Sequence, residues 1–189
     1  MEDLINSKNF IEIDFHCFYI LGMNYLNINN LEKSLFYLKK SISINNNFVP
    51  SLINIANIYA HQEKYNEAIK LLNDAKSIDK NNSLIFYNLG NNFEKSKQYD
   101  KAIEAFEKAI SIKKDFYQAH SNVATIYKNK KQNDEKAIYH YDQAIFYNKD
   151  FDQAWSNKSS LLEEIGDLKG ALKCVNVAIE INPNSSEAL

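Results

Sequence analysis

Asparagine side chains recur at a fixed interval along this chain of 189 residues. The series is Asn54, Asn88, Asn122 and Asn157, with successive spacings of 34, 34 and 35 residues. A carboxamide carries two donors and two acceptors, so it can pair with the N–H and the C=O of a peptide backbone whatever the peptide's side chains are. The interval therefore predicts a row of backbone-binding groups, provided that the fold places them on one face.

The other residue types that could do chemistry show no comparable pattern. His16, His61, His120 and His140 lack the close helical spacing of paired metal ligands. The glycine motifs that cradle phosphates do not occur. We therefore expect no metal, no cofactor and no catalytic site, and the sequence predicts a protein that is not an enzyme.

Charge and cysteine usage narrow the class of partner and the compartment. The formal net charge is −2, and no arginine occurs, so the chain lacks the cationic face that nucleic acid requires. Cys17 and Cys174 lie far apart, which favours a reducing compartment and small buried side chains over a disulfide. With no signal peptide or membrane-spanning run in the sequence, we expect a cytoplasmic protein without direct membrane insertion.

The interval of the asparagines belongs to an internal repeat of the whole chain. The repeats are predicted at residues 15–48, 49–82, 83–116, 117–151 and 152–185, and the fourth is one residue longer than the others. Small residues hold the eighth position, namely Gly22, Ala56, Gly90, Ala124 and Ser159, and the twentieth, namely Ser34, Ala68, Ala102, Ala137 and Ala171. Small side chains at fixed sites let two helices approach closely. The period therefore predicts a helical hairpin in each repeat.

Apolar positions and breaks agree with this phase. Large residues hold the eleventh position, namely Tyr25, Tyr59, Phe93, Tyr127 and Leu162. Polar segments such as Asn29-Asn30 and Gly166-Asp167 fall where the first helix of a hairpin must end. Pro50 falls near a helix start, where its missing N–H costs little.

The segment NLGNNFEKSKQYDKAIEAFEKAI, Asn88 to Ile110, resembles a consensus tetratricopeptide repeat, and the resemblance extends over all five repeats. It implies an all-α superhelix, a solenoid of five stacked helical hairpins. Three residues depart from the pattern by replacing an apolar side chain: His120, Lys158 and Lys76. We expect these departures to alter local packing only.

The resemblance also implies that the first helices of successive hairpins line a concave groove. With the fourth, seventh, eighth and eleventh positions packed inward, the second, fifth, sixth, ninth, twelfth and thirteenth positions of these helices are expected to face the groove. The predicted groove residues are Asn54, Asn88, Asn122, Asn157, Tyr19, Met23, Asn57, Tyr87 and Asn91. The asparagines at the sixth position resemble the ladder in the repeats of O-linked N-acetylglucosamine transferases.

The ends of the chain are expected to differ from the repeats. Residues 1–14 are predicted to form a capping or partial-repeat helix, and residues 186–189 a stub of a further repeat or a tail. The first repeat has an apolar inner face, formed by Tyr19, Ile20, Met23 and Leu26. This face either anchors a partner side chain or is covered by residues 1–14.

The sequence therefore predicts a scaffold that binds an extended peptide or protein segment in an asparagine-lined groove. Two alternatives remain open at this point. The chain could be the substrate-recruiting arm of a larger enzyme such as a glycosyltransferase, or a structural protein that self-associates through its terminal repeats.

Overall fold

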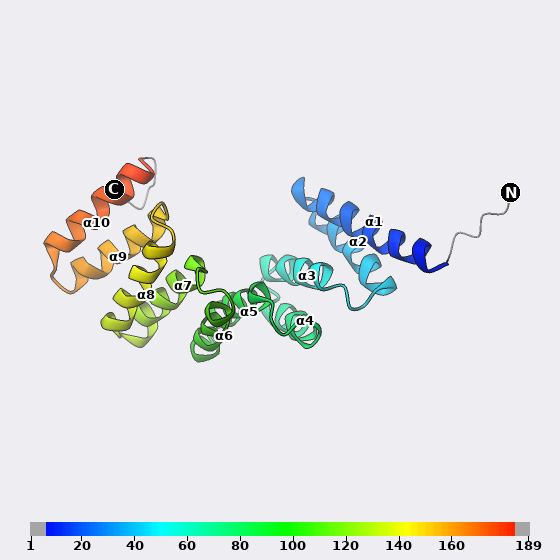
Figure 1. Ribbon diagram of the computed structural model, residues 1–189, viewed down its shortest axis with the longest axis horizontal. Helices are drawn as coiled ribbons and strands as arrows, with labels where there is room; N and C mark the ends of the chain where they lie inside the picture. Colours follow the sequence, from blue (N-terminus) through cyan, green and yellow to red (C-terminus); the bar gives the residue numbers. More distant parts are fainter. Residues whose placement is uncertain (1–6, 184–189) are drawn as a thin grey trace. The chain divides into compact units, whose positions relative to one another are not determined.

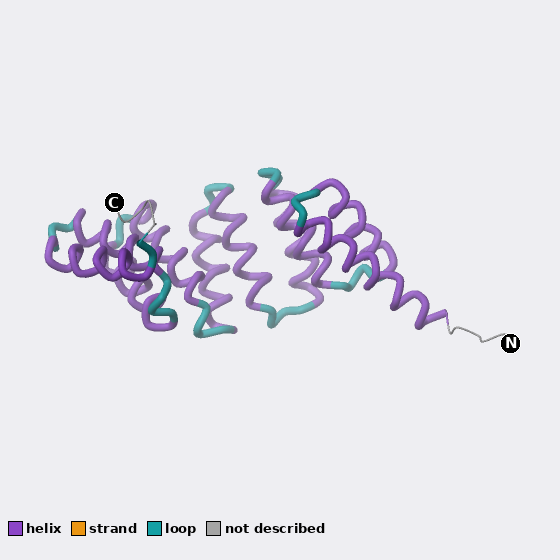
Figure 2. Tube along the Cα trace, turned by 90° about the horizontal axis from the view of Figure 1, so that it is seen from above, coloured by secondary structure: helices purple, strands orange, loops and turns teal. Residues whose placement is uncertain are grey.

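The computed structural model describes the backbone of residues 7–183 and the side chains of residues 15–183. Every regular element in this range is a helix (Figures 1 and 2), which confirms the all-α fold. The helices are α1 (Ser7–Asn27), α2 (Leu31–Ile44), α3 (Val49–His61), α4 (Tyr65–Ile78), α5 (Ser83–Lys95), α6 (Tyr99–Ile112), α7 (Tyr117–Ile126), α8 (Asp134–Tyr147), α9 (Asp152–Glu164) and α10 (Leu168–Ile181), with a short π-helical segment η1 (Tyr127–Lys131) after α7. The predicted stub at residues 186–189 lies outside the described residues.

The chain divides into two compact units, Met1–Ser96 and Lys97–Leu189. In the first unit α1 packs on α2 and α3 on α4, each pair joined by a short turn (Figure 1). In the second unit α7 packs on α8 and α9 on α10. Neighbouring hairpins also contact each other, through α2 and α3 in the first unit and through α8 and α9 in the second. The boundary falls in the turn between α5 and α6, inside the predicted third repeat.

Helix α1 is longer than the first helix of the other repeats. It runs without a break from Ser7 to Asn27, so residues 7–14 extend the first helix instead of forming a separate one. The segment before Phe15 contains neither proline nor glycine, so no helix-breaking residue separates it from the first repeat. Whether residues 1–14 cover the apolar face of the first repeat lies outside the described side chains.

The turn inside each hairpin contains one residue in the left-handed conformation. These residues are Asn29, Glu63, Lys97, Gln132 and Gly166. At Gly166 the next amide, of Asp167, donates to the carbonyl of Leu162 at 2.8 Å, and the amide of Gly166 donates to Glu163 at 3.0 Å. This pair of bonds is the Schellman motif, which ends a helix by satisfying its last carbonyls. The first four turns adopt the left-handed conformation without glycine, at a cost of about 1 kcal/mol each.

The extra residue of the fourth repeat is absorbed by η1. The amide of Asn133 donates to the carbonyl of Tyr127 at 3.1 Å. This bond spans one residue more than the equivalent bond from Lys64 to Tyr59 after α3. Gln132 then takes the left-handed conformation, with φ of 48°, and the turn continues as in the other repeats. A single-residue insertion in an α-helix is commonly accommodated as a π turn.

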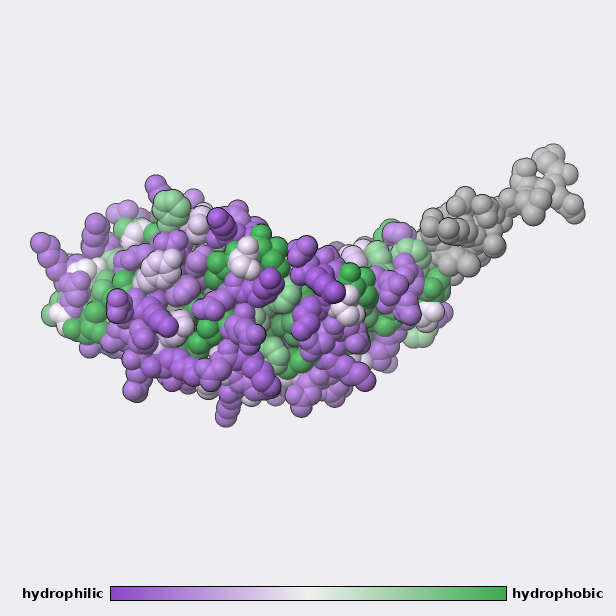
Figure 3. All heavy atoms as spheres, turned by 60° about the horizontal axis from the view of Figure 1, so that its bottom comes forward, coloured by the Kyte–Doolittle hydropathy of each residue, from purple (hydrophilic) through white to green (hydrophobic). Residues whose placement is uncertain are grey.

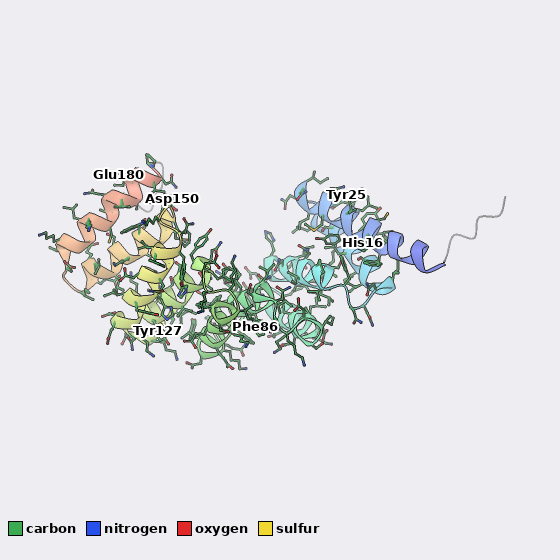
Figure 4. All side chains as sticks on the ribbon, viewed as in Figure 1. His16, Tyr25, Phe86, Tyr127, Asp150 and Glu180 are labelled. Carbon is green, nitrogen blue, oxygen red and sulfur yellow. The ribbon has the colours of Figure 1, made fainter. Side chains whose placement is uncertain are left out.

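The small residues of the repeat lie where the two helices of a hairpin are closest. All five residues of the twentieth position are buried, and Leu38 of α2 is fully buried against α1. A Cβ added at Gly22 would lie 2.7 Å from Cγ of Leu38, so a larger residue would force the two helices apart. The hairpins also stack aromatic rings, as in Tyr25 of α1 (Figure 4) on Tyr37 of α2 at 5.4 Å.

Hydrophobic residues interrupt the hydrophilic surface in several places (Figure 3). A helix that spans a bilayer needs a long apolar stretch, and residues 7–183 contain none.

Candidate protein-binding surface

Helix α3 presents one continuous outer stripe, formed by the second, sixth, ninth and thirteenth positions of its repeat. These residues are Pro50, Asn54, Asn57 and His61, and all of them are exposed or half-buried. Their spacing of four, three and four residues places them on one helical face. The remaining positions of α3 include the buried residues Leu52, Ile53, Ile55, Ala56 and Ile58. Two carboxamides therefore stand about one helical turn apart on the open face of α3.

The carboxamide of Asn54 is held in a fixed orientation. Its Nδ2 donates to the carbonyl oxygen of Pro50 at 2.8 Å. This bond uses one N–H, so Oδ1 and the second N–H remain for a ligand. Asn57, one turn further along, is exposed and has no hydrogen bond to the described residues. The pair can offer both acceptors and donors to an extended backbone.

Asn88 is not equivalent to Asn54, although it occupies the same repeat position. It is only 8% exposed, and its Nδ2 is buried without a hydrogen-bond partner among the described residues. Asn92, one turn later, donates from Nδ2 to the carbonyl of Asn88 at 2.8 Å, while its Oδ1 is buried and unpaired. In this repeat the two side chains serve the packing of α5, and a ligand on the surface does not reach Nδ2 of Asn88.

The fifth position does not line the surface as expected. Ile53, Ser121 and Ser156 are buried there. Tyr19 is half-buried, packs against the cluster that contains Leu38, and meets Phe48 edge-on at 5.1 Å. At Tyr19 the fifth position therefore packs against Phe48, in the segment that leads into α3, and not at the open surface.

The remaining predicted residues of the first unit are all half-buried. Met23 is half-buried, next to Ile20, which is 56% exposed. Tyr87 and Asn91 of α5 are also half-buried. An apolar patch of α1 therefore stays at the surface around Ile20 and Met23, whereas Tyr19 and Leu26 pack inward.

In the second unit Asn122 on α7 and Asn157 on α9 are half-buried. A polar network joins η1, which continues α7, to α9: Nζ of Lys128 donates to Oγ of Ser160 at 2.8 Å and pairs with Oε1 of Glu164 at 3.0 Å. These three residues hold the twelfth, ninth and thirteenth positions, which are among those predicted to face the groove. Lys158, a departure from the repeat pattern, is neutralised by Asp142 of α8 at 2.5 Å.

The structure brings together two histidines that lie 20 residues apart in the sequence. Nδ1 of His120 on α7 lies 3.2 Å from Nδ1 of His140 on α8. Aromatic rings surround the pair, since His120 stacks on Tyr147 and His140 on Tyr127. His120 is buried, and it fills the apolar position that it occupies in the repeat pattern.

The histidine pair could have been predicted from the repeat itself. Position four of the first helix meets position 23 of the second helix in other hairpins. In the first repeat these positions hold Phe18 and Tyr37, which stack at 6.2 Å. In the fifth they hold Trp155 and Cys174, which share a cluster. Close spacing within one helix does not reveal this pair, because His120 and His140 lie on two different helices.

Burial keeps both imidazoles neutral. It lowers the pKa of His120, partly offset by a hydrogen bond with the backbone of Lys114. Burial, the charge of His120 and that of Lys136 together lower the pKa of His140 from the ordinary 6.5 to about 4. At neutral pH one ring therefore donates its N–H to the other, and this hydrogen bond links α7 to α8.

Cysteine placement corrects one expectation. Cys174 is buried, and burial raises the pKa of its thiol, but Cys17 is exposed. Position three, which Cys17 holds, is buried in the later repeats by the preceding hairpin. Among residues 15–183 no group of three or more histidine, cysteine, aspartate or glutamate side chains is placed to hold a metal ion.

Comparison with known protein families follows the repeat boundaries. One sequence model of the tetratricopeptide repeat matches residues 49–115, and a second matches residues 15–48 and 152–185. Together these ranges cover well over half of the chain. A comparison with curated proteins gave no match.

Solved structures share the fold at low sequence identity. MamA 41-end from Desulfovibrio magneticus RS-1 is 18% identical with a TM-score of 0.79, over 92% of this chain and 97% of that one. Pseudomonas aeruginosa pilF is 14% identical with a TM-score of 0.84, over 94% and 81%. YrrB, described as a TPR protein with an unusual peptide-binding site, is 19% identical with a TM-score of 0.71, over 99% and 96%. The repeat models, the helical hairpins and these structures together show that the chain belongs to the tetratricopeptide repeat family.

Proposed function

We propose that this chain is a protein-interaction scaffold that holds an extended peptide segment on the outer stripe of its first helices. The observation that carries the proposal is the pair of carboxamides on α3. Asn54 is oriented by its bond to Pro50, and Asn57 stands open one turn away. Groups fixed in advance lose little freedom when a ligand binds.

The chemistry of the stripe favours peptide backbone over other ligands. Carboxamides carry no charge, so they discriminate against neither acidic nor basic side chains, and each can both donate and accept. The apolar patch around Ile20 and Met23 on α1 adds a place for one large side chain of the ligand. The likeness to the asparagine ladder of O-linked N-acetylglucosamine transferases is part of this proposal, and it applies best to Asn54. The peptide-binding site named for YrrB belongs to a protein of the same fold.

The test begins with a random peptide library displayed on phage, selected on the whole chain. A selected peptide is then titrated against the double variant Asn54→Ala and Asn57→Ala. Each lost hydrogen bond costs about 0.5 to 1.5 kcal/mol, so the loss of two should lower the affinity about 5- to 150-fold.

A matched control exists on α4. Asn66 and Asn73 are exposed, and Nδ2 of Asn73 donates to the carbonyl of Ile69 at 3.0 Å, as Asn54 does to Pro50. Alanine at both of these positions should leave the affinity unchanged. Equal losses in the two double variants, or a loss in the control alone, would overturn the proposal. Asn88 is unsuitable for this test because its amide nitrogen is buried.

A further inference from the structure

The second helix of one hairpin packs against the first helix of the next, and the same positions of the repeat form this contact each time. In the first unit Leu38 of α2 forms a buried cluster with Ile55 and Ile58 of α3, and Leu31, Leu35 and Ile42 of α2 pack around it. Nearby, Oγ of Ser51 on α3 donates to Oγ of Ser41 on α2 at 3.0 Å. The receiving face of a second helix therefore consists of positions 17, 21, 24 and 28. The inserting face of the following first helix consists of positions three, seven and ten.

The same register recurs in the second unit, between α8 and α9. Tyr141, at position 24, shares a cluster with Leu161 at position ten. Ile145, at position 28, shares one with Ala154 at position three. The two faces are therefore a property of the repeat and not of one pair of helices.

Helix α10 carries a receiving face that nothing in the described chain covers. Leu168, Leu172 and Ile179 hold positions 17, 21 and 28, and they are 67%, 61% and 37% exposed. The opposite side of α10 is buried, at Ala171, Cys174 and Ala178. The exposed residues form an apolar stripe of the same composition as the one that α2 buries against α3.

Helix α1 carries an inserting face that is also open. Cys17, Leu21 and Asn24 hold positions three, seven and ten, and all three are exposed. Ile28, one turn further, is 70% exposed. An asparagine fits at position ten of an inserting face, because Asn92 holds that position in α5 and is 3% exposed. In α3 and α9 position ten holds Ile58 and Leu161, which are both buried.

We propose that copies of this chain associate head to tail, with α10 of one copy receiving α1 of the next. The occupant is a second copy because the chain itself supplies both halves of the contact, in the register that its internal hairpins already use. A symmetric pairing of two α10 helices would leave the α1 face open, whereas the head-to-tail contact covers both faces. Such a contact is heterologous, so it adds copies one after another. The inference goes beyond peptide binding, which uses the outer stripe of the first helices.

Sedimentation velocity over a concentration series tests this arrangement. The weight-average mass of the unmodified chain should rise with concentration. Leu172→Glu places a charge in the receiving face, and Leu21→Glu places one in the inserting face, so each variant alone should stay monomeric. An equimolar mixture of the two keeps one intact face of each kind and should stop at the mass of two chains.

Each result of this experiment decides the proposal. A monomeric mass for the unmodified chain at all concentrations overturns it and leaves the α10 face to a different occupant. Association of Leu21→Glu alone also overturns it, because that result indicates a symmetric α10 contact. Phe146→Glu is the control, since Phe146 is 69% exposed but lies outside both faces, and it should associate as the unmodified chain does. Both glutamate variants should keep their affinity for the selected peptide, so failure of one proposal is distinguishable from failure of the other.

Discussion

The imidazoles of His120 and His140 meet head-on. Their Nδ1 atoms are 3.2 Å apart and their ring centroids 5.5 Å apart. The difference corresponds to one ring radius on each side, so both nitrogens lie close to the line that joins the ring centres. This is the alignment of an N–H···N hydrogen bond, and it requires that at least one of the two rings be neutral.

The hydrogen-bonded pair of His120 and His140 makes the stability of the second unit depend on pH. The pKa of His140 falls from 6.5 to about 4 on folding, so between these values the folded chain binds fewer protons than the unfolded chain. The contribution of His140 to the free energy of unfolding is therefore fully present above pH 6.5. It decreases as the pH falls toward 4, by on the order of 3 kcal/mol at most. Urea unfolding at neutral and mildly acidic pH measures the decrease.

The control for this prediction is His140→Gln, which cannot take up a proton in that range. The variant should lose less stability on acidification than the unmodified chain, even if it is less stable at neutral pH. An unchanged pH slope in the variant would contradict the assignment.

Ser34→Ala should stabilise the first unit. Oγ of Ser34 is fully buried and has no hydrogen-bond partner among the described residues, and the other repeats have alanine at this position. Removing an unsatisfied buried hydroxyl should raise the free energy of unfolding by about 1 kcal/mol. Ser41→Ala is the matched control: it deletes the partner of Ser51 and should lower the free energy of unfolding by a similar amount. Chemical denaturation of both variants measures the two signs, and a loss of stability in Ser34→Ala would show that the hydroxyl is satisfied.

Asn92→Leu should also stabilise the fold. The corresponding residues of α3, α7 and α9 are Ile58, Ile126 and Leu161, and all three are buried. Leucine would remove the buried, unpaired Oδ1 and add apolar contacts, for a gain of about 1 to 2 kcal/mol. Thermal unfolding should show a higher Tm. A lower Tm would mean that a buried water or another group already pairs with that oxygen.

Glu63→Gly should stabilise the turn between α3 and α4. Glu63 has φ of 60°, and its turn has the bonds of the Schellman motif, with Lys64 N–H donating to Tyr59 at 2.8 Å. Glycine adopts this conformation without strain, as Gly166 does in the fifth repeat. The gain should be about 0.5 to 1 kcal/mol, because the more flexible unfolded chain offsets part of it. Lys64→Gly, at φ of −84°, should instead destabilise the chain in the same denaturation assay.

The fold was predictable from the sequence because it depends on a period. Helix boundaries follow from small residues and polar breaks that recur in every repeat, and each copy reinforces the others. The conformation of η1 was harder to predict. The sequence shows one extra residue in the fourth repeat, but whether that residue is accommodated in a π turn depends on the backbone hydrogen bonds around Tyr127.

The candidate surface was predictable only in part. Asn54 and Asn88 share a repeat position, yet one is oriented at the surface and the other has its amide nitrogen buried. The difference depends on the side chains around each asparagine and not on its own type. The histidine pair was missed for a related reason, since its two members belong to different helices and come together only through the pairing of positions four and 23.

The most direct test of the binding surface is an NMR titration of the side-chain amides of asparagine, observed on the ¹⁵N-labelled chain as the selected peptide is added. We predict that the amide resonances of Asn54 and Asn57 shift while those of Asn66 and Asn73 on α4 remain in place. Shifts confined to the α4 pair, or a bound peptide that leaves Asn54 and Asn57 unmoved, would contradict the proposal that the outer stripe of the first helices binds the peptide.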